Sequence, residues 1–108
     1  MLNRKVQRKM NAYLSKEVRK KYRATWQEEF IVGMIAYLGP MNTKRVLLET
    51  GYEGVMSPAT AHKYLHKAIG NKLLSIETVK EDKREVLIDY TDKGIDFLNE
   101  IKCSRLKS

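Results

Sequence analysis

A single pair of β-forming runs lies among segments that otherwise have helical spacing. Residues 74–79 and 86–90 are rich in β-forming side chains, and a charged turn at 80–84 separates them. Two such runs around a polar turn predict a β-hairpin. The chain of 108 residues has the length of one domain. The sequence therefore predicts one mostly helical domain, 1–108, with a small hairpin in the α+β class.

Helix start and stop signals place two helices before the middle of the chain. Thr25 to Glu28 fits a capping box, and Gly39-Pro40 prevents continuation, so a central helix is expected at about 26–38. Its apolar residues at helical spacing are Phe30, Ile31, Met34, Ile35 and Leu38. A short helix capped by Asn42 is expected to end before Gly51, with inward side chains Val46, Leu47 and Leu48.

Two further helices flank the hairpin. Ser57-Pro58 is a strong helix start, with Ser at the N-cap and Pro at the first helical position, and predicts a helix at about 58–69. Residues 52–56 connect it to the preceding helix. Thr91 caps a last helix at about 92–103, whose inward side chains are expected to be Ile95, Leu98 and Ile101.

The positive charge is concentrated at the start of the chain. The net charge is +8; residues 1–23 hold nine basic residues and one acidic residue, while 24–108 hold twelve of each. A helix over 4–22 is expected, with an apolar stripe formed by Val6, Met10, Leu14 and Val18. Its bases could contact phosphates, and its stripe could cover the core or a second copy of the chain. A helix lying on a membrane surface is a third alternative.

Several classes of protein do not fit the sequence. No run of about 18 apolar residues is present, and the charged start lacks the apolar segment of a secretory signal, so we expect a cytoplasmic protein. A single cysteine, Cys103, forms no internal disulfide and no paired-cysteine zinc site. His62 and His66 are spaced i, i+4, but no neighbouring acid or cysteine completes a site, so no metal or other cofactor is predicted. No nucleophile–base arrangement is present, so an enzyme is not expected.

Three motifs resemble the MarR family of regulators. Residues 57–65 resemble the opening of that family's recognition helix, 81–88 resemble its wing, and 91–94 resemble the Thr-x-x-Gly that begins the next helix. The expected elements follow the order α-α-α-α-β-β-α, in which three helices, a hairpin and a closing helix form the order of a winged helix-turn-helix. The resemblance covers residues 25–100 and implies that fold. We therefore divide the domain into a basic helix, 1–24, and a winged-helix core, 25–103.

The sequence departs from that family in three places. Residues 52–56 resemble an insertion, Lys72 stands where the family usually has Gly before the strand, and about ten residues follow Asn99. The resemblance thus indicates a short form without long C-terminal dimerisation helices. Room for the small effectors that such relatives bind is not expected, and an effector is not predicted.

The order of elements predicts which side chains meet DNA. The helix at 58–69 is expected in the major groove and the wing at 74–90 at the minor groove. The predicted DNA contacts are Ser57, Ala59, Thr60, His62, Lys63, His66 and Lys67 of the helix, and Lys80, Lys83 and Arg84 of the wing. Additional phosphate contacts are predicted from Arg4, Lys5, Arg8, Lys9, Arg19 and Lys20.

Two functions remain open on the sequence. The first is a sequence-specific transcription regulator that binds duplex DNA as a homodimer, with Val6, Met10, Leu14 and Val18 in the dimer interface. The alternative is a winged-helix adaptor or inhibitor that acts on transcription or replication machinery, which the neutral charge of 24–108 favours.

Overall fold

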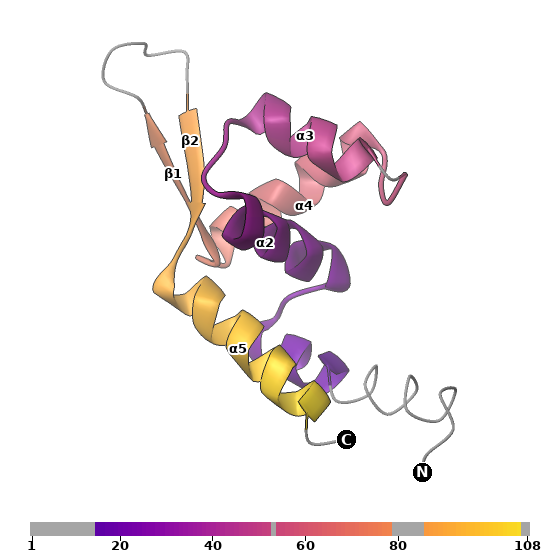
Figure 1. Ribbon diagram of the computed structural model, residues 1–108, viewed down its shortest axis with the longest axis vertical. Helices are drawn as coiled ribbons and strands as arrows, with labels where there is room; N and C mark the ends of the chain where they lie inside the picture. Colours follow the sequence, from indigo (N-terminus) through magenta and orange to yellow (C-terminus); the bar gives the residue numbers. More distant parts are fainter. Residues whose placement is uncertain (1–14, 53, 79–85, 107–108) are drawn as a thin grey trace.

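A computed structural model describes residues 15–52, 54–78 and 86–106. Residues 15–22 are helical, and the named elements are α2 (Trp26–Leu38), α3 (Thr43–Tyr52), α4 (Pro58–Gly70), β1 (Leu74–Thr78), β2 (Val86–Tyr90) and α5 (Asp92–Leu106). The predicted order α-α-α-α-β-β-α is confirmed. Helices α2, α3 and α4 gather beside the hairpin, and α5 runs away from the hairpin base (Figure 1). No helix within the described ranges is both long and apolar enough to cross a membrane.

Both ends of α2 follow the predicted signals. The Thr25 hydroxyl accepts a hydrogen bond from the Glu28 backbone N–H at 3.3 Å, and the Glu28 carboxylate accepts one from the Thr25 N–H at 2.7 Å. This reciprocal pair satisfies donors that the first helical turn leaves free. At the other end, Gly39 has φ 98° and donates its N–H to the Ile35 carbonyl at 2.8 Å.

The core forms where α2 meets the other elements. Its fully buried residues include Ile31, Val32 and Ile35 of α2, Val46 of α3, Leu65 of α4, Ile88 of β2 and Phe97 of α5. One prediction of an inward side chain was wrong, because Leu48 of α3 is 65% exposed. Leu38, the last of the apolar residues at helical spacing in α2, is 41% exposed at the end of that helix.

The end of α3 differs from the prediction. The helix does not end before Gly51 but continues through it to Tyr52. The positive φ that marks the turn is at Gly54, with φ 69°, and the Gly54 N–H donates to the Gly51 carbonyl at 3.0 Å. Met56 then enters the core, with 8% of its surface exposed. The connector is therefore anchored by a buried side chain.

The hairpin is tied to the helices through the middle of β2. Strands β1 and β2 pair antiparallel, with Ile76 opposite Ile88. On its other edge, Ile88 exchanges two backbone hydrogen bonds with Met41, at 2.8 and 3.1 Å. Met41 is itself buried and lies in the link between α2 and α3. Backbone hydrogen bonds thus join the middle of β2 to the residue pair that precedes α3.

The helical segment 15–22 packs against α5. The Tyr22 ring lies 5.1 Å from the Phe97 ring, centroid to centroid, and its hydroxyl donates to the Glu100 carboxylate. Lys21 Nζ contacts the other Glu100 oxygen at 2.6 Å. The hydrogen bond from the Tyr22 hydroxyl to Glu100 raises the pKa of Tyr22 to about 12. The hydrogen bonds that Glu100 accepts from Lys21 and Tyr22 lower the pKa of Glu100. Burial of Phe97 was not predicted; Ile95 and Leu98 are only half-buried.

Candidate nucleic-acid interface

The start of α4 is fixed by its cap. The Ser57 hydroxyl accepts a hydrogen bond from the Thr60 backbone N–H at 3.3 Å and lies 3.0 Å from the Thr60 hydroxyl. Pro58 occupies the first turn, where its missing N–H costs no hydrogen bond. Ser57, Pro58 and Ala59 are exposed. The small residues at this end would let a ligand approach the backbone closely.

The helix has one buried and one exposed side. Helical spacing predicts Ala61, Tyr64, Leu65 and Ala68 on the inward side; Ala61, Leu65 and Ala68 are buried against the rest of the domain, and Tyr64 is half-buried. The residues predicted to contact DNA lie on the other side, where His62, Lys63, His66 and Lys67 are exposed and Thr60 is half-buried.

The exposed side of α4 is positive. No acidic residue occurs between 57 and 70. Lys63 Nζ lies 5.6 Å and Lys67 Nζ 5.1 Å from the centroid of the Tyr64 ring, so both ammonium groups lie near this aromatic ring. Phosphates and base acceptors could meet two lysines here without a competing carboxylate.

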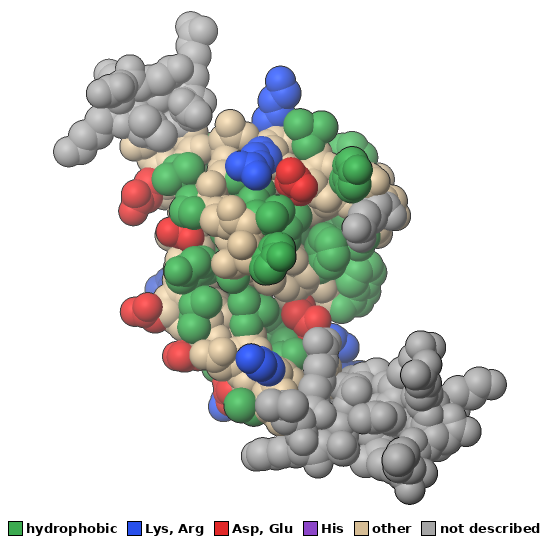
Figure 2. All heavy atoms as spheres, viewed as in Figure 1, with side chains coloured by type: hydrophobic (Ala, Val, Ile, Leu, Met, Phe, Trp, Pro, Cys, Tyr) green, Lys and Arg blue, Asp and Glu red, His purple; other side chains and the backbone are tan. Residues whose placement is uncertain are grey.

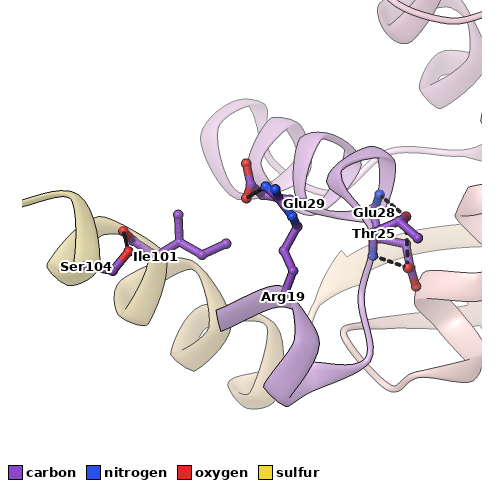
Figure 3. Close-up of polar contacts among 6 residues, drawn as sticks. All are labelled: Arg19, Thr25, Glu28, Glu29, Ile101 and Ser104. Carbon is purple, nitrogen blue, oxygen red and sulfur yellow. Dashed lines mark hydrogen bonds and ion pairs between the residues drawn. The ribbon is translucent and has the colours of Figure 1, made fainter. Parts of the chain in front are cut away.

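The far end of α4 is held by a buried carboxylate that the sequence did not reveal. The Asn71 amide donates to Glu28 Oε1 at 2.8 Å and to the Arg23 carbonyl at 3.1 Å. Glu28 is 1% exposed, and its other oxygen serves the capping box of α2 (Figure 3). One side chain therefore joins the start of α2 to the end of α4. Because Glu28 and Asn71 lie 43 residues apart, no local pattern could have paired them.

The predicted wing contacts Lys80, Lys83 and Arg84 lie outside the described residues. The same holds for the predicted phosphate contacts Arg4, Lys5, Arg8 and Lys9, and for the predicted interface residues Val6, Met10 and Leu14.

Of the predicted phosphate contacts in the described part of the basic segment, one side chain is exposed and the other is in an ion pair. Lys20 is exposed, but Arg19 Nη1 lies 3.1 Å from Glu29 Oε1 in a pair with about one-fifth of each side chain exposed (Figure 3). The sequence did not indicate this partner. The Glu29 carboxylate neutralises the Arg19 charge that was predicted to contact a phosphate. Val18 is half-buried and packs against the chain's own core.

Known proteins with similar sequences are transcription regulators. The HTH-type transcriptional regulator MgrA of Staphylococcus aureus is 33% identical over 89 residues, which are 82% of this chain and 57% of MgrA. MgrA and the structural neighbours support a MarR-type winged-helix family for this chain. This is a family of DNA-binding regulators, in agreement with the prediction that the chain is not an enzyme. No protein-family model matches the chain.

Solved structures share the MarR-type fold. RV1404 from Mycobacterium tuberculosis aligns with a TM-score of 0.77 and 16% identity over 95% of this chain and 66% of its own. The S. aureus MepR–DNA complex aligns with a TM-score of 0.75 and 14% identity over 94% of this chain and 79% of MepR. At these identities the likeness shows the fold alone. The chain spans just over half the length of MgrA.

Lys72, one of the departures from the MarR-type pattern, has a left-handed backbone conformation. Lys72, where the family usually has Gly, adopts φ 62°, the left-handed region that glycine favours. Its carbonyl accepts a hydrogen bond from the Thr91 hydroxyl at 2.6 Å. Lys72 therefore adopts a backbone conformation that glycine would adopt with less strain.

An apolar groove lies between α2, the end of α3 and α5. It has a volume of about 660 Å³, and its lining includes Phe30, Met34, Tyr37, Tyr52 and Leu98. Tyr37 and Tyr52 are 88% and 87% exposed, and hydrophobic side chains gather on the face drawn in Figure 2. The groove has the volume to admit a small molecule, although room for an effector was not expected from the sequence. That no effector binds stays a prediction.

Proposed function

We propose that this protein is a cytoplasmic transcription regulator that binds specific sites in duplex DNA. The observation that carries the proposal is the exposed, acid-free side of α4 with Lys63 and Lys67, on a fold shared with MepR, whose structure with DNA is known. In this proposal α4 lies in the major groove and the wing meets the minor groove. Ser57, Thr60 and His62 face the same duplex.

The base-reading role of α4 is tested by two substitutions and a charge control. A cognate site is first selected from random duplex DNA. We expect Lys63→Ala and His62→Ala to reduce discrimination between cognate and random duplexes by about 1–3 kcal/mol each, the usual value of a base-edge contact. Lys102→Ala removes an exposed lysine from α5 and should leave discrimination unchanged. If both variants bound all duplexes more weakly by the same factor, Lys63 and His62 would contact phosphates rather than base edges.

We further propose that the protein acts as a homodimer through the predicted stripe, with the surrounding bases adding sequence-independent affinity. A dimer would place two α4 helices in successive major grooves. Met10→Asp with Leu14→Asp should then give a monomer by sedimentation and weaken DNA binding together. Replacement of Arg8 and Lys9 by Gln should weaken binding without changing the oligomeric state. If the double-Asp variant stayed dimeric, the dimer interface would have to lie outside the predicted stripe.

The groove favours the second candidate function, a winged-helix adaptor. Its exposed Tyr37 and Tyr52 are the kind of aromatic anchors found in protein interfaces. The two functions differ in their dependence on salt. If the protein neutralises several phosphates, its DNA affinity falls steeply between low and physiological salt. No measurable binding to any duplex in low salt would favour the adaptor.

A further inference from the structure

The two histidines of this chain meet on the exposed side of α4. His62 and His66 are one helical turn apart, and their Nε2 atoms lie 3.1 Å from each other. The ring centroids are 4.4 Å apart, at an interplanar angle of 65°. Both side chains are exposed, so an ion could reach both Nε2 atoms from solvent. Without an ion this separation is that of a hydrogen bond between the rings, and it also brings two metal-binding nitrogens together.

The separation of the two nitrogens matches a chelate. Metal–imidazole bonds of about 2.0–2.1 Å place two ligand nitrogens about 2.9 Å apart at a right angle and about 3.4 Å apart at the tetrahedral angle. The observed 3.1 Å lies between these limits. One ion could therefore lie within bonding distance of both Nε2 atoms at this separation, once the rings turn their lone pairs toward it.

The charges around the pair also permit a cation. Lys63 and Lys67 are the nearest bases along the helix, but their ammonium groups lie over the Tyr64 ring. At 100° per residue, Tyr64 projects from the helix side opposite the histidines, so the lysines lean away from them. Without an ion, one Nε2 must carry a proton and donate to the other. In a chelate both protons move to Nδ1, and both lone pairs face the ion.

We infer that His62 and His66 form a two-histidine site for a divalent transition metal such as Zn²⁺, Ni²⁺ or Cu²⁺. Imidazole suits these ions, whereas Mg²⁺ prefers oxygen ligands. Among the described residues, no cluster of three or more His, Cys, Asp or Glu could hold a metal. Water therefore completes the coordination of an ion bound by these two rings, and the site is open and exchangeable.

A consequence for DNA rests on the proposed function. Coordination occupies the His62 Nε2 that a base contact would use, so zinc and a cognate duplex weaken each other's binding. Linkage requires the same factor in both directions. Metal binding itself is measured without DNA, so its failure is distinct from failure of DNA recognition.

The test is a calorimetric titration of the full chain carrying Cys103→Ser, which removes the exposed thiol as a competing ligand. We expect one Zn²⁺ per chain and no binding of Mg²⁺. His62→Gln or His66→Gln should weaken Zn²⁺ binding at least tenfold.

A spacing control separates chelation from the mere presence of histidine. His66→Gln combined with Lys67→His keeps two histidines on α4 but places them i, i+5, on diverging sides of the helix. This variant should bind Zn²⁺ as weakly as the single His66→Gln variant. Equal affinity of the spacing variant and the parent would overturn the inference. One Zn²⁺ per two chains with metal-dependent association would overturn it too, because the ion would then bridge molecules.

Discussion

Replacement of Gly94 by alanine tests the packing of α5 against the base of the hairpin. A Cβ atom added to Gly94 would lie 2.3 Å from the Leu73 carbonyl oxygen, 3.3 Å from its carbon and 3.4 Å from Val32 Cγ1. Non-bonded carbon atoms pack best at about 3.5–4.0 Å, so the first turn of α5 would have to move by roughly 1 Å. The obstacle is backbone, which cannot rotate away as a side chain can.

The movement would also strain the hydrogen bonds at this junction. The Thr91 N–H donates to the Leu73 carbonyl at 3.2 Å, and the Thr91 hydroxyl donates to the Lys72 carbonyl at 2.6 Å. Overpacking costs about 1–3 kcal/mol, and each weakened hydrogen bond adds about 1 kcal/mol. We therefore expect Gly94→Ala to lower the free energy of unfolding by about 3–5 kcal/mol. For a domain of this size the melting temperature would fall by roughly 12–20 °C.

Urea unfolding and thermal melts followed by circular dichroism measure both quantities. Gly33→Ala is the matched control, because Gly33 lies within α2 and its added Cβ would be 3.8 Å from Leu98 Cδ2, an ordinary contact. It should be neutral or stabilise the fold by up to about 1 kcal/mol, since alanine favours helix. If Gly94→Ala were no less stable than Gly33→Ala, the close approach of α5 to Leu73 would be refuted.

Three further substitutions test other local features. Thr25→Ala removes the hydroxyl that caps α2 and should cost about 1 kcal/mol in urea unfolding; an unchanged midpoint would show that the cap contributes nothing. Lys72→Gly places glycine at φ 62° and should leave stability equal or higher by up to about 1 kcal/mol, whereas Lys67→Gly in α4 should cost about 1 kcal/mol; the opposite order would contradict the left-handed assignment. Tyr22, whose pKa is raised to about 12, contributes stability below pH 10 that is lost as the pH rises through 12. The stability advantage of the parent over Tyr22→Phe should therefore shrink between pH 9 and 12, and a constant difference would contradict the bond to Glu100.

Features set by neighbouring residues were predictable from the sequence. The cap of α2, the Ser57-Pro58 start of α4 and the hairpin each depend on a few residues in a row, and the structure has all three. The buried and exposed sides of α4 were also predicted, because they follow from helical periodicity.

Features set by distant residues were not predictable. The sequence placed the end of α3 at Gly51, because two glycines close together offer two stops and only packing selects Gly54. The pairing of Arg19 with Glu29 and of Asn71 with Glu28 depends on how helices cross, and no spacing rule encodes that. The convergence of His62 and His66 depends on side-chain rotation as well as on spacing, so the i, i+4 pattern was insufficient to assign a site.

The backbone pairing of Met41 with Ile88 couples the position of the hairpin to the start of α3. If β2 is displaced away from Met41, either the two backbone hydrogen bonds between them break or the link between α2 and α3 moves with the strand. Helix α3 in turn packs on α4. A displacement of β2 would therefore bear on α4 through Met41 and α3, so the positions of the hairpin and of the proposed recognition helix are coupled.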